Sequence, residues 1–281
     1  MSLTGKARKA GVMGWPIGHS LSPALHGWWL ARHGIDGVYV PMAVRPENLA
    51  AALRALPILG FAGCNLTIPH KEPALTLVAR RDEVAARIGA VNTIVVGADG
   101  TLEGRNTDGY GFVASLRAAQ PDWSARRGPA VVIGAGGAAR AVIVALLDEG
   151  VPEIRVTNRT DERSATLAAE FGHLVKPTDW RRRHDTLGEA ALLVNTTSLG
   201  MSGEPALELA LDRLSQQALV TDLVYAPLET PLLAAARARG NRVVDGLGML
   251  LYQAQPGFAA WFGVTPAVTP ELRAAVLATM A

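Results

Sequence analysis

The first residues that could do chemistry in this sequence lie in a glycine-rich stretch, VVIGAGGAAR, at 131–140. Gly134, Gly136 and Ala139 fit the pattern G-x-G-x-x-A, which allows a tight turn, a close approach of backbone to pyrophosphate, and close packing of helix on strand. The helix that follows would offer free backbone N–H groups to phosphates. A tight strand-to-helix turn that binds no ligand can have the same sequence pattern, so the pattern alone is weak evidence for a dinucleotide site.

The end of the next strand indicates which dinucleotide to expect. NAD sites usually place Asp or Glu there, about 20 residues after the glycine turn, where it binds the ribose hydroxyls. In this sequence the run IRVT is followed by Asn158, Arg159 and Thr160, and Arg163 comes one helical turn later. Guanidinium groups and short polar donors suit a phosphate dianion, so we expect NADP(H). The alternative is a helix capped by Thr160 that carries two exposed arginines.

Polar side chains also follow the predicted strands of the first 110 residues. They are Ser20 and Ser22, then Asn65, Thr67 and Lys71, then Asn92, and finally Asn106 and Asp108. Hydroxyls, amides, one ammonium and one carboxylate at strand ends suggest a small polyhydroxylated ligand. Each residue also has a structural alternative, because serine, asparagine and aspartate cap helices and turns, and a single lysine is usually exposed. Composition and spacing alone indicate an NADP-linked oxidoreductase with an unspecified substrate.

The elements that must position these residues are short β-branched runs alternating with longer Ala/Leu-rich segments. This alternation is typical of α/β proteins with largely parallel sheets. Helices fit between the strands, with Pro23 and Pro46 in first helical turns. We expect strands over 10–14, 38–43, 61–66 and 92–96 in the first half, and over 130–133, 153–157, 191–195, 219–223 and 242–244 in the second.

The second set of strands is sufficient for a doubly wound nucleotide domain. A helix from Asp108 through Leu116 would lead into it, and after Asp245 two apolar helical segments remain without a new strand. We expect these segments to return to the first domain. The predicted organisation is a substrate domain of residues 1–107 plus 245–281 and a Rossmann-type NADP-binding domain of residues 108–244.

The composition excludes several other classes of protein. No apolar run in the 281 residues reaches the roughly 18 needed for a membrane helix, and the first residues show no apolar export signal. A net charge of +2 does not indicate nucleic acid as a partner. Cys64 is the only cysteine, and the six histidines show no metal spacing, so no disulfide or metal is expected. We therefore expect a cytoplasmic protein.

Eight motifs occur together in an order that is seen in one family. They are HSLSPALH, NLTIPHK, GAVNT, GRNTDG, GAGGAAR, NRT, NTTSLGM and DGLGMLLYQA. Across nearly its whole length the chain resembles shikimate dehydrogenases. The resemblance implies an NADP-dependent oxidoreductase of aromatic amino-acid biosynthesis, which reversibly reduces 3-dehydroshikimate to shikimate with NADPH. It also implies a cleft between the two domains as the site, and a monomer or homodimer.

The resemblance also implies roles for individual residues. Lys71 and Asp108 are similar to the family's catalytic pair, with Lys71 as the general acid and base. Ser20, Ser22 and Tyr225 match the groups that hold the substrate carboxylate, and Thr67, Asn92 and Gln253 match groups around the ring hydroxyls. The cofactor positions are Gly134, Ala135, Gly136, Gly137 and Ala138 at the pyrophosphate, Asn158, Arg159, Thr160 and Arg163 at the adenosine phosphate, and Thr197, Leu223, Gly246 and Met249 near the nicotinamide.

Two positions depart from the family pattern, and two other functions stay open. Gly27 stands where the family more often has Asn, and Leu66 stands where Val is commoner. Both departures concern helix stability and local packing. An enzyme that prefers quinate, or uses quinate and shikimate equally, would share almost all of these motifs. A non-catalytic NADP sensor would also share the fold, although sensing requires neither Lys71 nor Asp108.

Overall fold

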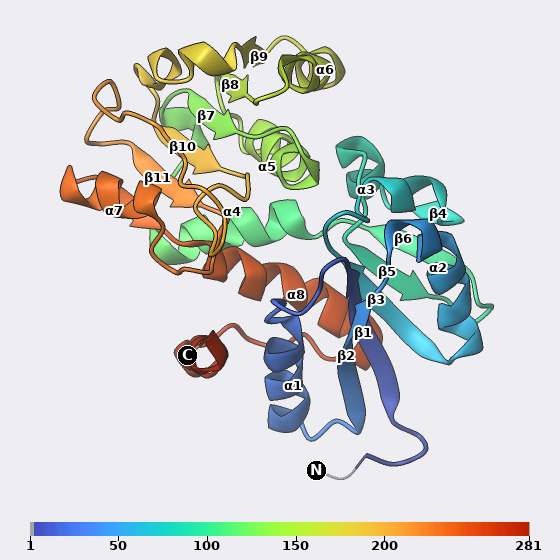
Figure 1. The fold of residues 1–281 in the computed structure, drawn as a ribbon. Helices are drawn as coiled ribbons and strands as arrows, with labels where there is room; N and C mark the ends of the chain where they lie inside the picture. The colour runs from blue at the N-terminus through green and yellow to red at the C-terminus, as the bar shows by residue number, and fades with distance from the viewer. Residues whose placement is uncertain (1–2, 281) are drawn as a thin grey trace. The chain divides into compact units, whose positions relative to one another are not determined.

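The computed structural model describes residues 3–280 and divides into two compact α/β units (Figure 1). Unit 1 is formed by the chain up to Gly111 and from Leu250 onward, and unit 2 by Phe112–Met249. Two helices, α4 (Asp108–Ala119) and α8 (Gly246–Phe262), belong partly to each unit. The domain ends expected from the sequence, 107/108 and 244/245, fall at the starts of these helices. The observed division lies about one turn inside each helix.

The sheet of unit 1 is mixed, and this corrects the expectation of a largely parallel one. Its strand order is β2-β1-β3-β5-β6-β4, with β1 parallel to β2 and β3, and β5 antiparallel to β3 and β6. The strands are β1 (Arg8–Gly14), β2 (Gly37–Ala43), β3 (Phe61–Leu66), β4 (Arg80–Arg81), β5 (Thr93–Val96) and β6 (Leu102–Arg105).

Strand β6 was not expected from the sequence because its four residues, LEGR, include two charged ones. Leu102 and Gly104 are buried, whereas Glu103 and Arg105 are half-buried and form an ion pair of 2.6 Å. The alternation follows from the two-residue period of a strand, which sends successive side chains to opposite faces.

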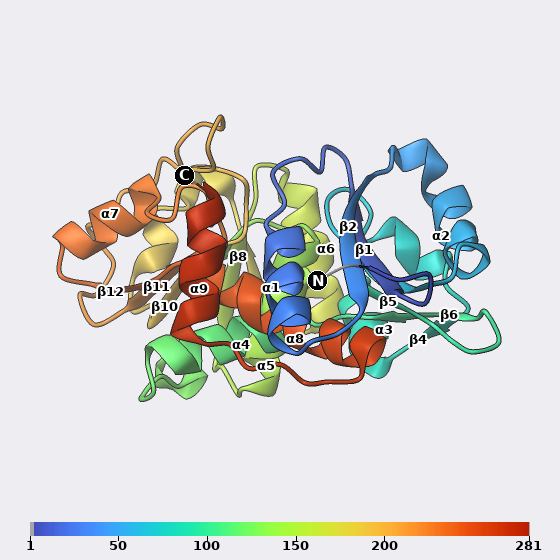
Figure 2. The same cartoon turned by 90° about the horizontal axis from the view of Figure 1, so that it is seen from below.

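Helices cover both faces of this sheet. They are α1 (Ser22–Arg32), α2 (Leu49–Ile58), α3 (Glu83–Ile88) and α9 (Pro270–Leu277), together with the last part of α8. Helices α1 and α2 lie on opposite faces (Figure 2). The α2 side is an aliphatic core that includes Leu53, Leu56 and Ile94. On the α1 side, aromatic rings from α1, β2 and α8 pack together, and the Trp261 Nε1 donates a hydrogen bond to the Ile94 carbonyl at 2.9 Å.

Unit 2 has a parallel sheet in the order β12-β11-β10-β7-β8-β9. If β7 is numbered as strand 1 and the sheet is read from β9 to β12, the order is 3-2-1-4-5-6, which is that of a Rossmann fold. The predicted doubly wound architecture is therefore confirmed. The strands are β7 (Ala130–Ile133), β8 (Ile154–Thr157), β9 (Val175–Thr178), β10 (Leu192–Asn195), β11 (Leu219–Asp222) and β12 (Arg242–Val244). Strand β9 was not expected from the sequence, because its residues VKPT are largely exposed at the edge of the sheet.

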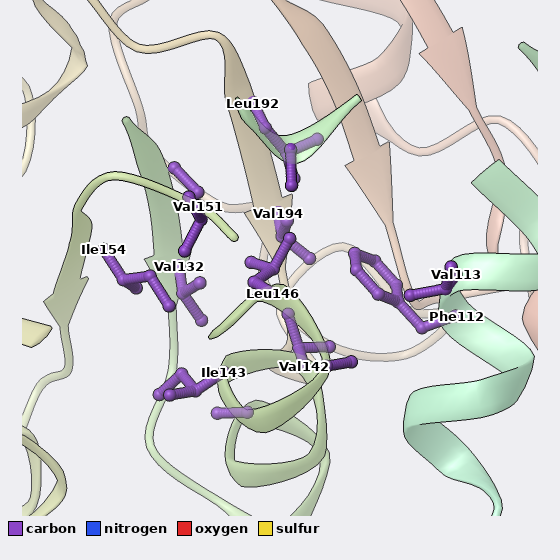
Figure 3. Close-up of a cluster of buried hydrophobic side chains, with 14 of the residues drawn as sticks. Phe112, Val113, Val132, Val142, Ile143, Leu146, Val151, Ile154, Leu192 and Val194 are labelled. Atoms are coloured by element: carbon purple, nitrogen blue, oxygen red, sulfur yellow. The ribbon is translucent and has the colours of Figure 1, made fainter. Parts of the chain in front are cut away.

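The helices of unit 2 are α5 (Gly137–Asp148), α6 (Asp161–Phe171) and α7 (Pro231–Ala238), with the larger part of α4. Apolar side chains of α5 pack on the central strands, where Val142 and Leu146 lie against Val132 and Val194 (Figure 3). The central strands are buried on both faces, which explains their uninterrupted apolar runs. Within residues 3–280, no helix has the length and apolar character that crossing a bilayer requires.

Candidate active site

The centre of the candidate site in unit 1 is an ion pair between Lys71 and Asp108. The Lys71 Nζ lies 2.6 Å from the Asp108 Oδ2, and the exposed fractions of the two side chains are 20% and 5%. Lys71 lies beyond the end of β3, and Asp108 is the first residue of α4. The ion pair places Lys71 in a partly buried site, which disfavours the interpretation of an ordinary surface lysine.

Asn92 fixes the second oxygen of the carboxylate. Its Nδ2 donates to the Asp108 Oδ1 at 2.8 Å, while its Oδ1 accepts the backbone N–H of Thr107 at 2.9 Å. Because the Thr107 N–H can only donate, the amide of Asn92 has one orientation that satisfies both partners. The carboxylate of Asp108 is therefore held on both oxygens, by an ammonium and by an amide.

Three further side chains place this group. The Asn106 Oδ1 accepts the N–H of Asp108 at 3.0 Å, and the Thr107 Oγ1 donates to the Gln253 carbonyl at 2.8 Å. The Gln253 Oε1 in turn accepts from the Asn92 Nδ2 at 3.3 Å. Thr107 was not among the site residues predicted from the sequence, although it lies between Asn106 and Asp108 in GRNTDG. Its neighbours were the only signal that could have identified it.

Ser20 and Ser22 lie where β1 leads into α1. Ser22 is the first residue of α1, and within the described chain no side chain caps this helix, so Ser22 does not serve as the helix cap. The Ser22 side chain is buried. Ser20 is half-buried, and its Oγ accepts the Ser22 N–H at 3.4 Å. Thr67 is half-buried at the end of β3, and its N–H is bonded to the Met13 carbonyl at 3.0 Å.

In unit 2, the glycine turn joins β7 to α5. Gly134 has φ +113°, a backbone conformation that favours glycine, and a Cβ there would lie 2.5 Å from the Thr196 Oγ1. Gly136 differs, because a Cβ on it would point into open space: among residues 3–280, no heavy atom beyond its chain neighbours comes within 4 Å. Over the same described range, no side chain caps the N-terminus of α5.

This turn fits the pyrophosphate of a dinucleotide. Open space beside Gly136 and uncapped N–H groups at a helix N-terminus are what a bound phosphate requires. Ala135 is buried, and Gly137 and Ala138 are half-buried at the start of α5. The predicted pyrophosphate residues are therefore contiguous on one strand-to-helix turn.

The predicted adenosine-phosphate residues follow β8, the neighbour of β7 in the sheet. Asn158 is half-buried and its Nδ2 donates to the Thr160 carbonyl at 3.0 Å, while Arg159, Thr160 and Arg163 are exposed. Thr160 precedes α6, but in the described structure its side chain makes no capping hydrogen bond. The cap that would explain Thr160 without a ligand is therefore not formed. An amide and two arginines at this strand end suit a phosphate dianion.

The remaining predicted cofactor residues follow β10, β11 and β12. The Thr197 Oγ1 donates to the Asn195 Oδ1 at 2.7 Å, and the Asn195 Nδ2 donates to the Asp222 Oδ1 at 3.0 Å. Leu223 directly follows β11, and a Cβ on Gly246 would lie 2.4 Å from its carbonyl oxygen. The buried Met249 lies in the first turn of α8. One hydrogen-bonded group therefore joins the loops after two adjacent strands.

The Asp222 carboxylate accepts two further hydrogen bonds, from the backbone N–H of Val224 and from the Thr230 hydroxyl. Burial raises the pKa of Asp222, and these three hydrogen bonds oppose the shift. Tyr225, predicted near the substrate carboxylate, belongs to unit 2, and burial raises the pKa of its phenol. Its role beside Ser20 and Ser22 stays a prediction.

Comparisons with known proteins point to one family. Residues 12–94 match the model of the shikimate dehydrogenase substrate binding domain, and residues 118–221 match the model of shikimate / quinate 5-dehydrogenase. The chain is 60% identical over 275 residues to a shikimate dehydrogenase (NADP(+)) of Paramagnetospirillum magneticum, a match that covers 98% of this chain and 100% of the relative.

Two solved structures are similar over almost the whole chain. Shikimate 5-dehydrogenase of Thermus thermophilus, in complex with NADP(H) and shikimate, has a TM-score of 0.86 and 38% identity, covering 96% of this chain and 99% of the other. Quinate dehydrogenase of Corynebacterium glutamicum, in complex with NAD, has a TM-score of 0.89 and 33% identity, with coverage of 97% and 99%. The similarity thus extends to both units of this chain.

Proposed function

The chain belongs to the shikimate dehydrogenase family, and from this premise we propose that Lys71 is the general acid and base of its reaction, with Asp108 as the partner that directs it. The reaction is the reversible reduction of 3-dehydroshikimate to shikimate by NADPH, an oxidoreduction at a CH–OH group. The observation that carries the proposal is the 2.6 Å pair of Lys71 and Asp108, held from the far side by Asn92.

The proton transfer follows from the chemistry of the lysine. When NADPH is bound it supplies the hydride for the ketone carbon. Negative charge then develops on the carbonyl oxygen, and the Lys71 ammonium can both stabilise that charge and donate the proton. In the oxidation direction, a neutral Lys71 accepts the proton of the substrate hydroxyl. Asp108 accepts a hydrogen bond from Nζ throughout and so fixes the direction of the amine.

The other predicted residues are proposed to bind the two molecules. Ser20, Ser22 and Tyr225 would hold the substrate carboxylate, and Thr67, Asn92 and Gln253 would bind its ring hydroxyls. Unit 2 would hold NADP through the turn at Gly134, Ala135, Gly136, Gly137 and Ala138, the positions Asn158, Arg159, Thr160 and Arg163, and the nicotinamide group of Thr197, Leu223, Gly246 and Met249. The open space at Gly136 and the exposed arginines after β8 support this assignment.

The test is the absorbance of reduced nicotinamide when purified protein is given each pairing of shikimate or quinate with NADP⁺ or NAD⁺. Activity that is strongest with shikimate and NADP⁺ is expected. Quinate is the second candidate, because one similar structure is a quinate dehydrogenase with NAD. It differs from shikimate in a hydroxyl at the carbon that bears the carboxylate, near the proposed serines. Faster turnover of quinate with NAD⁺ would overturn both pocket assignments.

Absence of activity in all four pairings, with NADP⁺ still bound, would favour a non-catalytic sensor. We also propose that the protein works in the cytoplasm on a free small molecule, as a monomer or a homodimer. Size-exclusion chromatography with light scattering distinguishes these two states directly.

A further inference from the structure

The carboxylate of Asp222, the last residue of β11, is buried without a cation. Its exposed fraction is 0%, and the three hydrogen bonds that it accepts come from an amide, a backbone N–H and a hydroxyl. Among residues 3–280, no lysine, arginine or histidine forms an ion pair with it. Buried carboxylates are normally paired, because removal from water disfavours the charge. A ligand with a positive charge would supply the missing partner.

The groups around Asp222 fit the charged form of its side chain. The Val224 backbone N–H can only donate, and it reaches the Asp222 Oδ1 at 3.0 Å. The Asn195 Nδ2 donates to the same oxygen at 3.0 Å, and this orientation is fixed because the Asn195 Oδ1 accepts the Thr197 N–H at 3.1 Å. The Thr230 hydroxyl reaches the second oxygen, Oδ2, at 2.8 Å. Burial raises the pKa of Asp222, and all three hydrogen bonds oppose that shift.

Asp222 is joined to both loops that are proposed to hold the nicotinamide. Leu223 is the next residue in the chain, and Asn195, which donates to Asp222, also accepts the hydroxyl of Thr197 at 2.7 Å. These loops follow β11 and β10, which are neighbours in the sheet, and Rossmann domains bind their ligands at such carboxyl ends. Strand β8, which precedes the proposed adenosine-phosphate residues, is three strands from β11. That separation is about 14 Å at the usual strand spacing, so the charge of Asp222 acts mainly on the nicotinamide end.

The two forms of the cofactor differ in charge at this end. The nicotinamide ring of NADP⁺ carries a positive charge that the ring of NADPH lacks, whereas their phosphates are the same. We propose that ionised Asp222 favours the binding of NADP⁺ over NADPH and is a specificity-determining residue for the oxidation state of the cofactor. The attraction is stronger in a buried site than in water, because the effective dielectric constant is lower. The proposal rests on the proposed function, since it takes these two loops as the nicotinamide site.

Asp222→Asn removes the charge and preserves the three contacts. The new Oδ1 can accept from the Asn195 Nδ2 and the Val224 N–H, as the carboxylate does. The new Nδ2 would face the Thr230 hydroxyl, whose oxygen has two lone pairs and accepts only the Leu233 N–H, at 3.3 Å. Thr230 can therefore accept where it donated before. The variant tests the charge of the side chain rather than its shape.

The test is the ratio of two dissociation constants, Kd(NADP⁺)/Kd(NADPH), measured by calorimetry with the purified full chain at neutral pH. In Asp222→Asn the ratio should rise at least about threefold, because only the oxidised ring loses an attraction. The affinity for 2′-phospho-ADP-ribose, which lacks the nicotinamide, should change less than about twofold. A ratio that rises less than about twofold would overturn the proposal. An equal loss of affinity for all three ligands would make Asp222 a purely structural residue and also overturn it.

Asp212→Asn provides the matched control. It makes the same chemical change in unit 2, at a side chain that is 90% exposed and 3.9 Å from Arg239. Solvent screens this charge, so the ratio should stay at the wild-type value. An equal rise in both variants would mean that the net charge of the protein sets the ratio, and the proposal would be wrong.

The remaining outcomes separate this proposal from the proposed function. Wild-type protein that binds neither form of the cofactor overturns the NADP assignment and this inference with it. Wild-type protein that oxidises shikimate with NADP⁺, together with an unchanged ratio in Asp222→Asn, overturns this inference alone. If Asp222→Asn does not fold, Asp222→Ser is measured in the same way, because it is also neutral and leaves space for a water molecule beside the three donors.

Discussion

At the scale of single residues, the environment of Lys71 gives a direct prediction. Replacing it with Ala or Met should lower kcat by about 10² to 10⁴, the usual contribution of a general acid and base. NADP⁺ binding should be nearly unchanged, because the predicted cofactor residues belong to unit 2. The measurements are steady-state kinetics and a fluorescence titration with NADPH. The exposed Lys6, replaced in the same way, should leave kcat at the wild-type value.

Loss of NADP⁺ binding in the Lys71 variants would move this residue into the cofactor site or the fold. The effect of pH provides a separate test of its role. Lys71 must give up its proton before it can accept one from shikimate, so oxidation should become faster toward alkaline pH. A kcat profile that stays flat between neutral and alkaline pH would exclude Lys71 as the proton carrier.

His26 gives a prediction about stability. Its pKa is lowered by burial from 6.5 to about 3, so the unfolded chain takes up a proton there before the folded chain does. This neutral histidine therefore contributes stability that is complete above pH 6.5 and is lost as the pH falls toward 3. Between pH 7.5 and pH 5.0 the loss should be about 2 kcal/mol of unfolding free energy, at about 1.4 kcal/mol per pH unit below 6.5.

His26→Phe keeps a flat ring against Tyr39 and removes this titration. Urea unfolding at the two pH values should show a smaller loss for the variant, by about the same 2 kcal/mol. Above pH 7.5 the two proteins should have equal slopes of stability against pH, which is the internal control. An equal loss in both proteins between pH 7.5 and 5.0 would show that His26 does not carry this dependence.

At the scale of elements, two glycines of the turn between β7 and α5 should have different roles, Gly134 in stability and Gly136 in cofactor binding. Gly134→Ala should lower the unfolding free energy by at least about 1 kcal/mol, because of its positive φ and the contact with Thr196. Gly136→Ala should change it by less than about 1 kcal/mol, because its backbone suits alanine and its Cβ meets open space.

The Gly136→Ala substitution should also lower the affinity for NADP⁺ at least about tenfold, because the new methyl group fills the space proposed for the pyrophosphate. Thermal unfolding without ligand and NADP⁺ titration by calorimetry measure the two effects separately. Unchanged NADP⁺ affinity in Gly136→Ala would show that the pyrophosphate does not approach this glycine.

The elements also show what could be predicted from the sequence. Strands 61–66, 130–133 and 242–244 were placed to the residue. Strand 130–133 is a continuous apolar run, AVVI, directly before the glycine turn. Strands β4, β6 and β9 were missed because RR, LEGR and VKPT are short and polar, and their pairing depends on neighbouring strands rather than on local preference. Lys71, Asn92 and Asp108 were singled out as polar groups after predicted strands, Gln253 came only from the family resemblance, and the four do lie together. Thr107 needed the structure, because its hydrogen bonds join it to Asn92 and Gln253, which are far away in the sequence.

At the scale of the whole molecule, the two units should respond to different ligands. If unit 2 binds NADP and the site in unit 1 binds shikimate, each ligand alone should slow amide hydrogen exchange mainly in its own unit. NADP⁺ should protect peptides around 131–140 and 158–163, and shikimate should protect peptides around 65–71 and 92–108. Exchange measured by mass spectrometry tests this. Equal protection of both units by either ligand alone would contradict the assignment of one ligand to each unit.

The return of α8 to unit 1 has a consequence for how the protein is made. Unit 2 is one continuous stretch of chain, whereas the aromatic core of unit 1 needs Phe258 and Trp261, and the Asn92 group needs Gln253. Because a ribosome delivers the chain from the N-terminus, the first 111 residues must wait, incompletely packed, while the whole of unit 2 emerges. The nucleotide half can thus fold during translation, and catalytic competence arises only after the last helices have been synthesised.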